Sequence, residues 1–364
     1  MNELLAGLST RELSGGDIEV ADYARLPAAP LVSVDMITYN HAAYIREALD
    51  SVLMQQVDFP YEICLGEDGS TDGTREICIE YARKHPDKFR LFLRDRSNPA
   101  RAGYKVPFMH NGVETFDSCR GKYIATLEGD DYWTCRGKLM AQLCVLEERP
   151  HLSLCAHYAI AFDQALPWRV SAIPPTPLRD FDIKYELENC FFLATGSLVF
   201  RREQLDLDAF RSAWAGDSML IMQHLRHGNG IVLPKIMSMY RQHSAGASRG
   251  GAGYHPYTAN LDQWTLFRSL VSPQHIVSVN HGYAKQLCWY VDEERRRWRI
   301  CAALSLWWRL LLLARPNYGL PALTWLRLAM AATMTMISPT GLKMIRRVSE
   351  RTARARERAK SFFA

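Results

Sequence analysis

Between residues 31 and 127, short apolar runs alternate with segments in which apolar residues recur every three or four positions. Each run has the length of a β-strand, and each periodic segment has the spacing of one apolar helix face. The predicted strands are LVSVDMIT (31–38), YEICL (61–65), FRLFL (89–93) and KYIATL (122–127). The pattern therefore predicts the order β-α-β-α-β-α-β.

Capping signals accompany the helical segments between these strands. Asn40 can cap the first helix, Thr71 or Asp72 can cap the second, and Gly121 can end the third. Repeated βα units favour right-handed crossovers and a parallel sheet. We therefore expect an α/β fold with a mostly parallel sheet flanked by helices, in which the carboxyl ends of the strands share one rim.

Acidic residues follow two of these strands directly. Glu67 and Asp68 follow the second strand, and the segment Glu128-Gly129-Asp130-Asp131 follows the fourth. A single acidic group at a strand end commonly caps a helix or faces solvent, but two groups on one rim lie where open α/β sheets bind ligands. Carboxylate oxygens there suit Mg²⁺ or Mn²⁺ with a phosphorylated substrate. The pattern indicates an enzyme that handles nucleotides.

Three segments in this order carry a family resemblance: PLVSVDMITYNHAAYIREALDSVLMQQ, EDGSTDGT and GKYIATLEGDDYW. They resemble the nucleotide-binding half of family 2 glycosyltransferases, which are inverting enzymes with the GT-A fold. The resemblance is strong over about 31–157 and looser to about 248. It implies a nucleoside-diphosphate sugar donor lying across the rim and a saccharide or lipid-linked acceptor entering from the C-terminal half, in cell-surface polysaccharide or glycoconjugate synthesis.

The resemblance also implies roles for individual residues in donor and metal binding. Asp130 would bind the metal as the last acid of the family's D-x-D motif, where Glu128 replaces the usual first Asp. Donor contacts are expected from Thr38, Tyr39, Asn40, Glu67, Asp68, Arg94 and Glu128.

Candidate catalytic residues stand further along the chain. Asp217 opens a predicted helix and resembles the family's general base, with Gly216 in place of a Glu, although helix capping alone also explains an Asp there. Arg241 could pair with the diphosphate and His243 could bind the metal, because both follow a predicted strand. The segment 193–202 is expected to be a strand near the acceptor.

The cysteine content and the N-terminal residues indicate the cellular compartment. The chain has 364 residues and nine cysteines, an odd number without a Cys-x-x-Cys pair, which fits a reducing cytoplasm better than a disulfide framework. Residues 1–30 lack the pattern of a secretory signal. We therefore expect a cytoplasmic protein.

The net charge of +5 is concentrated at the C-terminus. Residues 341–364 carry eight Lys or Arg and two Glu, a net +6, so the charge does not line a nucleic-acid groove and no nucleic-acid partner is expected. The apolar stretches 300–314 and 320–338 are short or interrupted for a membrane span. Helices lying on the cytoplasmic face of a membrane fit this composition, as does a helical appendage packed on the protein itself or on a partner.

The expected organisation is an N-terminal extension (1–30), a GT-A domain (31–250) and a helical, basic C-terminal region (251–364). Within the GT-A domain, 31–157 is the expected nucleotide-sugar half and 158–250 the expected acceptor half. Two alternatives remain open. A nucleotidyltransferase usually has a Gly-rich phosphate loop, which TYNHAAYIRE lacks, and a non-catalytic sugar-nucleotide-binding scaffold is the other.

Overall fold

The computed structural model describes residues 3–106, 109–166, 168–174, 179–189, 193–213, 216–244, 246, 256–296 and 307–308. The chain divides into two compact units. One comprises 1–183 and 191–256, and the other 184–190 and 257–364. Each unit is described by itself.

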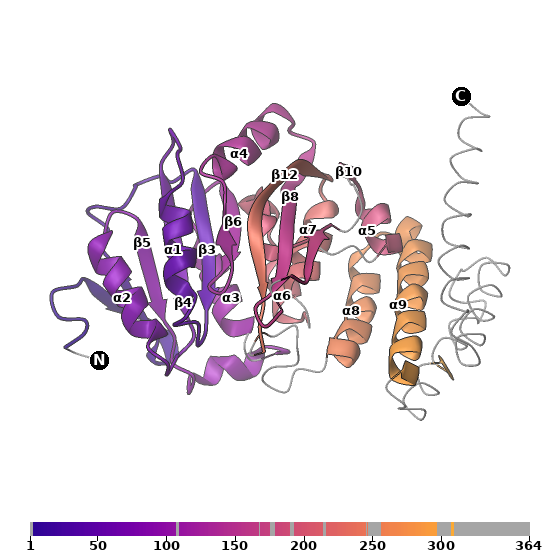
Figure 1. The fold of residues 1–364 in the computed structure, drawn as a ribbon, viewed down its shortest axis with the longest axis horizontal. Helices are drawn as coiled ribbons and strands as arrows, with labels where there is room; N and C mark the ends of the chain where they lie inside the picture. Colours follow the sequence, from indigo (N-terminus) through magenta and orange to yellow (C-terminus); the bar gives the residue numbers. More distant parts are fainter. Residues whose placement is uncertain are drawn as a thin grey trace. The chain divides into compact units, whose positions relative to one another are not determined.

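Four parallel strands form the centre of the first unit (Figure 1). Their order across the sheet is β5 (Phe89–Leu93), β4 (Tyr61–Glu67), β3 (Val32–Thr38) and β6 (Tyr123–Glu128). The residues of β4 and β5 are buried throughout, as in a parallel sheet covered on both faces. This arrangement confirms the α/β fold that the alternating pattern predicts.

The described strands extend this centre into a single 12-stranded sheet. On the β5 side the sheet continues antiparallel through β2 (Ile18–Ala21) and β1 (Thr10–Glu12). Beyond β6 the path runs through β11 (Val199–Arg201), β8 (Leu152–Asp163), β12 (Asn229–Gln242) and β10 (Asp180–Phe181), while β7 (Tyr132–Trp133) pairs with β12 and β9 (Val170–Ile173) pairs with β8.

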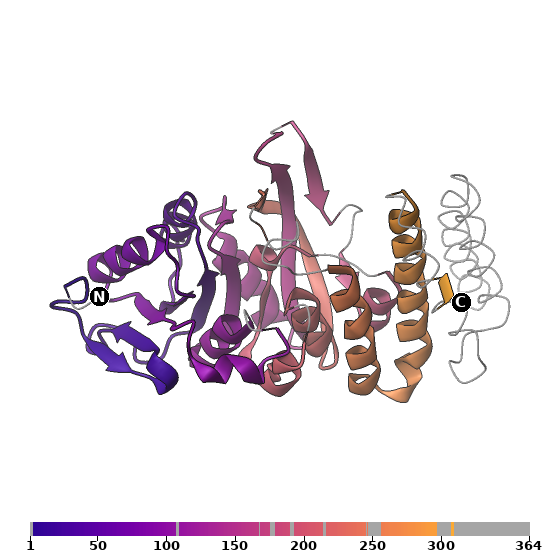
Figure 2. The same ribbon diagram turned by 90° about the horizontal axis from the view of Figure 1, so that it is seen from below.

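Helices cover both faces of the sheet. Figure 2 shows α1 (Ile45–Leu53) and α2 (Thr74–Lys84) on one face, and α3 (Met109–Ser118), α6 (Leu207–Arg211) and α7 (Gly216–Leu225) on the other. The apolar core includes Val34 and Met36 of β3, Leu49 of α1 and Leu91 of β5, which are fully buried. The helix α4 (Lys138–Glu148) contributes Leu139 to the same core.

The prediction that Asn40 caps the first helix is wrong. That helix begins at Ile45, and Asn40 adopts a left-handed backbone with a φ of 53°, which Asn tolerates better than most residues. Its side-chain oxygen instead accepts the N–H of Thr71 at 3.0 Å, and its N–H donates to the hydroxyl of Ser70 at 2.9 Å. Asn40 therefore joins the loop after β3 to the loop after β4.

The predicted strand at 193–202 is shorter in the structure. Val199–Arg201 form β11, and a 3-10 turn precedes them at Thr195–Ser197. The Thr126 hydroxyl donates to the carbonyl of Thr195 at 2.5 Å, so this turn is fastened to β6.

The second unit is helical in its described part, with most of α5 (Ile183–Asn189), α8 (Pro256–Leu270) and α9 (Ile276–Arg296). No described helix is long and apolar enough to cross a bilayer. Apart from 307–308, the apolar stretches 300–314 and 320–338 and the basic tail 341–364 lie outside the described residues.

Candidate active site

The carboxyl end of β3 is the centre of the acidic rim. The backbone N–H of Asp68 donates to the carbonyl of Thr38 at 3.0 Å, and the N–H of Gly129 donates to the carbonyl of Ile37 at 2.9 Å. The two acidic segments thus flank one strand end and are separated by two strand spacings, about 10 Å. A Cβ atom at Gly129 would lie 2.5 Å from the Thr38 hydroxyl oxygen, so this close approach requires glycine.

Two arginines hold Asp68, on the β4 side of the rim. The Arg101 guanidinium donates to both oxygens of this buried carboxylate, at 2.7 and 3.1 Å, and Arg96 donates to it at 3.0 Å. The Arg96 guanidinium also lies 4.2 Å from the ring centre of Tyr39, which is partly exposed. Neither arginine is among the expected site residues, although RDRSNPARAG directly after the third strand contained the signal.

Arg94 lies in the interior of the protein. Its guanidinium donates to the carboxylate of Asp17 at 3.2 Å and to side-chain oxygens of Asn111 and Thr115 at 3.3 Å each. Only 3% of the side chain is exposed, so protein groups enclose the guanidinium that the sequence analysis assigned to the donor.

Glu67 is fully buried beside Asp68. It accepts the N–H of Ser70 at 2.6 Å and pairs with the guanidinium of Arg75. Arg75 also donates to the carbonyl of Arg94 at 2.7 Å. Glu67 therefore ties the loop after β4 to the loop after β5.

A cluster of carboxylates and imidazoles surrounds Asp130, on the β6 side of the rim. Nε2 of His243 lies 2.9 Å from Oδ2 of Asp130, and Nε2 of His41 lies 3.7 Å from the same oxygen. Two trios have ligand atoms within 4.8 Å of one another: His41, Asp130 and His243, and Glu128, Asp130 and Asp131. The structure thus brings together the two predicted metal ligands and adds His41, whose place directly after Asn40 was an available signal.

The electrostatics of the cluster suit a cation. Burial opposes ionisation of Asp130, but the hydrogen bond with His243 and the nearby His41 hold its pKa below the ordinary value. Burial lowers the pKa of His41, which favours the neutral, ligating imidazole. Burial and the carboxylates of Asp130 and Asp217 raise the pKa of Glu128 to about 8. Negative charge is therefore crowded at this point.

The hydrogen bonding of one Asp130 oxygen indicates whether the cluster fits a metal ion. Oδ1 of Asp130 is buried and has no hydrogen-bond partner among the described residues. A buried oxygen without a hydrogen bond normally lowers the free energy of unfolding by about 1–3 kcal/mol or more. Carboxylate oxygens with imidazole nitrogens form a donor set that suits Mn²⁺, and carboxylates alone suit Mg²⁺. The residues present therefore fit a divalent cation.

Hydrogen bonds hold Arg241 against the acidic segment of the cluster. Its backbone N–H donates to Oδ1 of Asp131 at 2.7 Å, and its guanidinium donates to the carbonyl of Asp130 at 2.9 Å and to Glu47 at 2.6 Å. The guanidinium also stacks against three rings, with centroid distances of 4.8 to 5.4 Å, from Tyr44, Phe162 and Tyr132. Arg241 is thus held in one orientation beside the acidic segment.

Asp217 stands in the first turn of α7. Its carboxylate accepts the N–H of Ser218 at 2.7 Å, and burial raises its pKa. It lies close enough to Glu128 for its charge to raise the pKa of Glu128, to which Thr195 is hydrogen-bonded. The predicted base and the predicted D-x-D residue therefore belong to one group of side chains.

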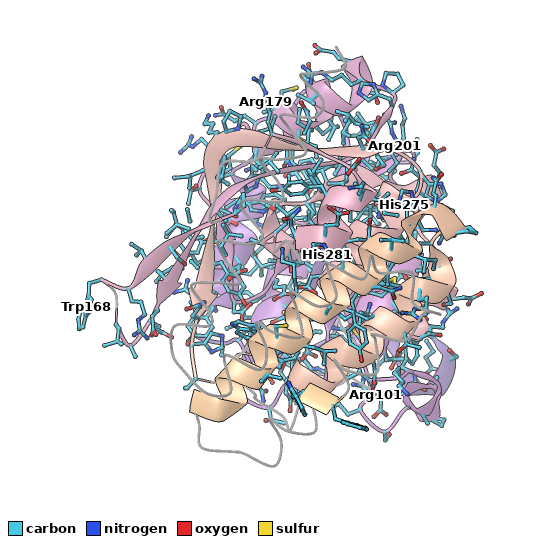
Figure 3. The ribbon with its side chains drawn as sticks, turned by 90° about the vertical axis from the view of Figure 1, so that its right-hand side faces the viewer. Arg101, Trp168, Arg179, Arg201, His275 and His281 are labelled. Atoms are coloured by element: carbon cyan, nitrogen blue, oxygen red, sulfur yellow. The ribbon has the colours of Figure 1, made fainter. Side chains whose placement is uncertain are left out.

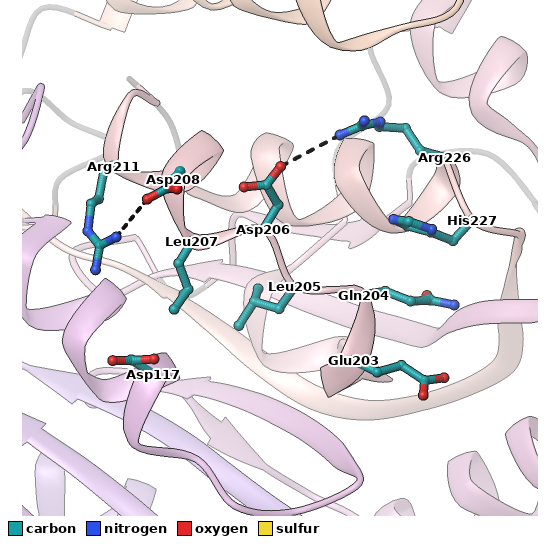
Figure 4. Close-up of a pocket in the computed structure, with 10 residues that line it drawn as sticks. All are labelled: Asp117, Glu203, Gln204, Leu205, Asp206, Leu207, Asp208, Arg211, Arg226 and His227. Carbon is teal, nitrogen blue, oxygen red and sulfur yellow. Dashed lines mark hydrogen bonds and ion pairs between the residues drawn. The ribbon is translucent and has the colours of Figure 1, made fainter.

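A separate pocket of about 600 Å³ lies around α6 (Figure 4). Asp206 pairs with Arg226 at 3.9 Å, and Arg211 pairs with Asp208 at 2.8 Å, along its wall. None of the rim residues discussed above lines it. Both arginines that line it pair with its aspartates, which leaves the carboxylate–imidazole cluster as the better candidate site.

Comparisons with known proteins show which family this domain resembles. Residues 33–207 match the family model described as Glycosyl transferase family 2. A relative, "Uncharacterized protein Rv1520" of Mycobacterium tuberculosis, is 34% identical over 217 residues, which cover 59% of this chain and 60% of the relative. "Chondroitin synthase" of Escherichia coli is 31% identical over 140 residues, covering 38% of this chain and 18% of that protein. The chain thus spans about three fifths of the length of the first curated relatives it matches.

Among solved structures, the chain is similar to S. aureus TarS residues 1–349 in complex with UDP-GlcNAc. The TM-score is 0.52 at 15% sequence identity, and the match covers 83% of this chain and 91% of that one. This likeness shows the fold, which is that of the GT-A glycosyltransferases.

Proposed function

Because residues 33–207 match the model of glycosyltransferase family 2, we propose that this chain is a metal-dependent, inverting enzyme of that family. It moves a sugar from a nucleoside-diphosphate sugar to an acceptor hydroxyl. The observation that carries the proposal is the buried Oδ1 of Asp130, which has no hydrogen-bond partner in the part of the chain that the structure describes, with two imidazoles and two further carboxylates around the residue.

In this proposal Asp130, His243 and His41 hold Mg²⁺ or Mn²⁺, with Glu128 and Asp131 beside them. A bound divalent cation would offset the negative charge that develops on the departing diphosphate, a contribution of several kcal/mol. Arg241 orients the acidic segment by donating to the Asp130 carbonyl. Its guanidinium lies beside that segment, where it can pair with the diphosphate.

The nucleoside end of the donor belongs, in this proposal, to the loops after β3 and β4. Thr38, Tyr39 and Asn40 line that part of the rim, and Asp68 is oriented there by Arg96 and Arg101. The separation of about 10 Å between the two acidic segments allows the base and ribose to lie at one and the diphosphate at the other.

Asp217 is the proposed general base. It removes the proton of the acceptor hydroxyl while the hydroxyl oxygen forms a bond to the sugar C1 and the bond from C1 to the diphosphate oxygen breaks. The displacement inverts the configuration at C1. The raised pKa of Asp217, caused by burial, favours proton uptake.

The wider role is proposed from the relatives. A synthase of a polysaccharide shares sequence with this chain, which supports synthesis of a cell-surface polysaccharide or glycoconjugate on a saccharide or lipid-linked acceptor. We infer a GT-A domain over 31–250, to whose sheet the extension 1–30 adds β1 and β2, and a C-terminal region over 251–364, with the basic end of the chain at the cytoplasmic face of a membrane.

A thermal-shift screen with UDP-, GDP- and dTDP-sugars, with and without Mn²⁺, tests the donor and metal together. One sugar nucleotide should raise the melting temperature of the wild type, more so with Mn²⁺, and Asp130→Ala should remove the Mn²⁺-dependent part. If no sugar nucleotide stabilises the wild type, the proposed function is wrong.

Product analysis separates the alternatives. A glycosyltransferase releases a nucleoside diphosphate from the donor, a nucleotidyltransferase exchanges pyrophosphate with a nucleoside triphosphate, and a scaffold binds the donor without turnover. The membrane role has its own test, since deleting 341–364 should move the protein from a vesicle pellet to the supernatant. Pelleting of the shortened protein with vesicles would contradict it.

A further inference from the structure

Trp168 is an exposed residue at the tip of a β-hairpin that extends from the candidate active site. The hairpin consists of β8 and β9, which pair antiparallel with Phe162 opposite Val170. Figure 2 shows it extending away from the rest of the sheet, and Figure 3 shows Trp168 at its outer tip. Trp168 is 78% exposed and Val170 is 60% exposed.

Hydrogen bonds hold the described residues on both sides of Trp168. The side chain of Asp163 accepts the N–H groups of Ala165 and Leu166 at 2.9 and 3.3 Å. The Arg169 N–H donates to the carbonyl of Leu166 at 2.8 Å, and the Asp163 N–H donates to the carbonyl of Arg169 at 3.2 Å. These bonds fix the backbone on both sides of the tip, so the hairpin presents the indole on an ordered support.

The hairpin is also joined to the residues around the candidate metal site. The hydroxyl of Tyr44 donates to the side chain of Gln164 at 2.6 Å, and the Gln164 N–H donates to the carbonyl of Gln242 at 2.9 Å. The Tyr44 ring lies 4.9 Å from the imidazole of His243, centre to centre. The turn therefore begins at the wall of the site.

One face of the hairpin leads from its tip to the site. Val170 is directly opposite Phe162 in the pairing of β9 with β8, so these two side chains share a face, and Trp168 lies in the turn two residues before Val170. Phe162 in turn lies 5.2 Å from the guanidinium of Arg241. Trp168 is five residues from Asp163 along the chain, which limits its distance from the rim to about 18 Å.

We propose that Trp168 at the tip, together with the face formed by Val170 and Phe162, is a binding subsite for the acceptor, and that the acceptor is a saccharide chain rather than a single sugar. The proposal rests on the proposed function and specifies its acceptor. A pyranose ring carries hydroxyls at its edge and C–H groups on its faces, and a C–H face stacks on the electron-rich face of an indole. Sugars held along the hairpin would direct the terminal hydroxyl toward Arg241 and Asp130.

The chemistry of the neighbours favours a saccharide over a lipid surface. The described residues next to the apolar face include Gln164 and Arg169, both exposed, which can hydrogen-bond sugar hydroxyls. The face is narrow and continuous with the candidate catalytic groups.

The experiment compares wild type, Trp168→Ala, Trp168→Phe and Trp289→Ala on a printed glycan array. Trp289 lies on α9 in the other unit and is 49% exposed, so it serves as a matched control for loss of an exposed indole. We expect the wild type to bind a set of oligosaccharides, Trp168→Ala to lose at least about tenfold in affinity for them, and Trp168→Phe to retain most of it. Trp289→Ala should bind as the wild type does.

Two outcomes overturn the proposal: binding by Trp168→Ala equal to that of the wild type, or no oligosaccharide bound by the wild type. Loss of sedimentation with phosphatidylglycerol vesicles in Trp168→Ala, with saccharide binding unchanged, would identify a lipid contact and also overturn it. The thermal shift with Mn²⁺ and sugar nucleotides should be the same in all four proteins. If that shift is present and saccharide binding fails, only the acceptor subsite is refuted, whereas its absence refutes the proposed function.

Discussion

Nε2 of His243 lies 2.9 Å from Oδ2 of Asp130, although the two residues are 113 positions apart in the chain. The contact joins the carboxyl end of β12 to the segment after β6, and it forms because β12 pairs with β8 and β7 in the same sheet as β6. The extension of the sheet beyond its parallel centre thus completes the carboxylate–imidazole cluster.

Replacing His243 tests whether this contact serves a cation. We expect His243→Ala to weaken Mn²⁺ binding by about tenfold or more, because one ligand and the hydrogen bond that orients Asp130 are lost. Isothermal titration with Mn²⁺ measures the effect. His275→Ala, in a 3-10 turn of the second unit, should leave Mn²⁺ affinity unchanged. Equal affinity in His243→Ala and the wild type would remove His243 from the site.

Replacing Asp217 tests its role as the general base. Asp217→Asn keeps the size of the side chain and its acceptor for the Ser218 N–H, but it cannot take up a proton in the same way. Transfer should fall by about 10²- to 10⁴-fold while the Kd of the donor stays the same. Asp208→Asn, whose side chain is 92% exposed on α6, is the control. Unchanged turnover in Asp217→Asn would rule out the role.

The Asp68–Arg101 pair should contribute to stability as well as to donor binding. Arg101→Met leaves a buried carboxylate with one guanidinium, and we expect the free energy of unfolding to fall by about 3 kcal/mol, measured by urea titration. Arg96→Met removes the partner that is 46% exposed and should cost less than about 1 kcal/mol. Equal decreases in the free energy of unfolding of the two variants would contradict the prediction that the more buried arginine contributes more to stability.

Lys138 provides a prediction about pH. Its Nζ is buried against the Trp133 ring at 4.0 Å and has no hydrogen-bond partner in the described part of the chain, and burial lowers its pKa to about 7. The unfolded chain holds this proton up to about pH 10.4. Between these values the folded state binds fewer protons, so the free energy of unfolding rises with pH, and the full penalty applies below about pH 7.

Lys138→Met should therefore stabilise the protein by a few kcal/mol at pH 6, with a gain that shrinks toward pH 10. Urea unfolding at several pH values measures the difference between variant and wild type. Lys122→Met is the control, because Lys122 is exposed and paired with Glu147 at 2.7 Å. A gain that does not depend on pH would mean that Lys138 keeps its proton in the folded state as it does in the unfolded chain.

The sequence predicts the central strands and the common rim because burial on both faces leaves runs rich in apolar residues such as 89–93, where only Arg90 is polar, and parallel pairing then puts the strand ends together. It does not predict the partners of the rim residues. The contact of Arg101 with Asp68 depends on how the loop after β5 folds back, and no local pattern encodes that path. The same holds for His41, which reaches Asp130 only because Asn40 turns the chain with a positive φ.

Asp17, near the start of the chain, is part of the support for the nucleotide side of the site. Its carboxylate accepts the N–H of Asp95 at 2.8 Å and pairs with the enclosed guanidinium of Arg94, at the base of the loop that carries Arg96 and Arg101. A shortened gene product that starts at residue 33, where the family match begins, would lack this carboxylate and the strands β2 and β1 that extend the sheet beyond β5. In this product the guanidinium of Arg94 would be buried without its carboxylate partner, and β5 would become an unpaired edge of the sheet. The folding unit therefore begins before residue 33.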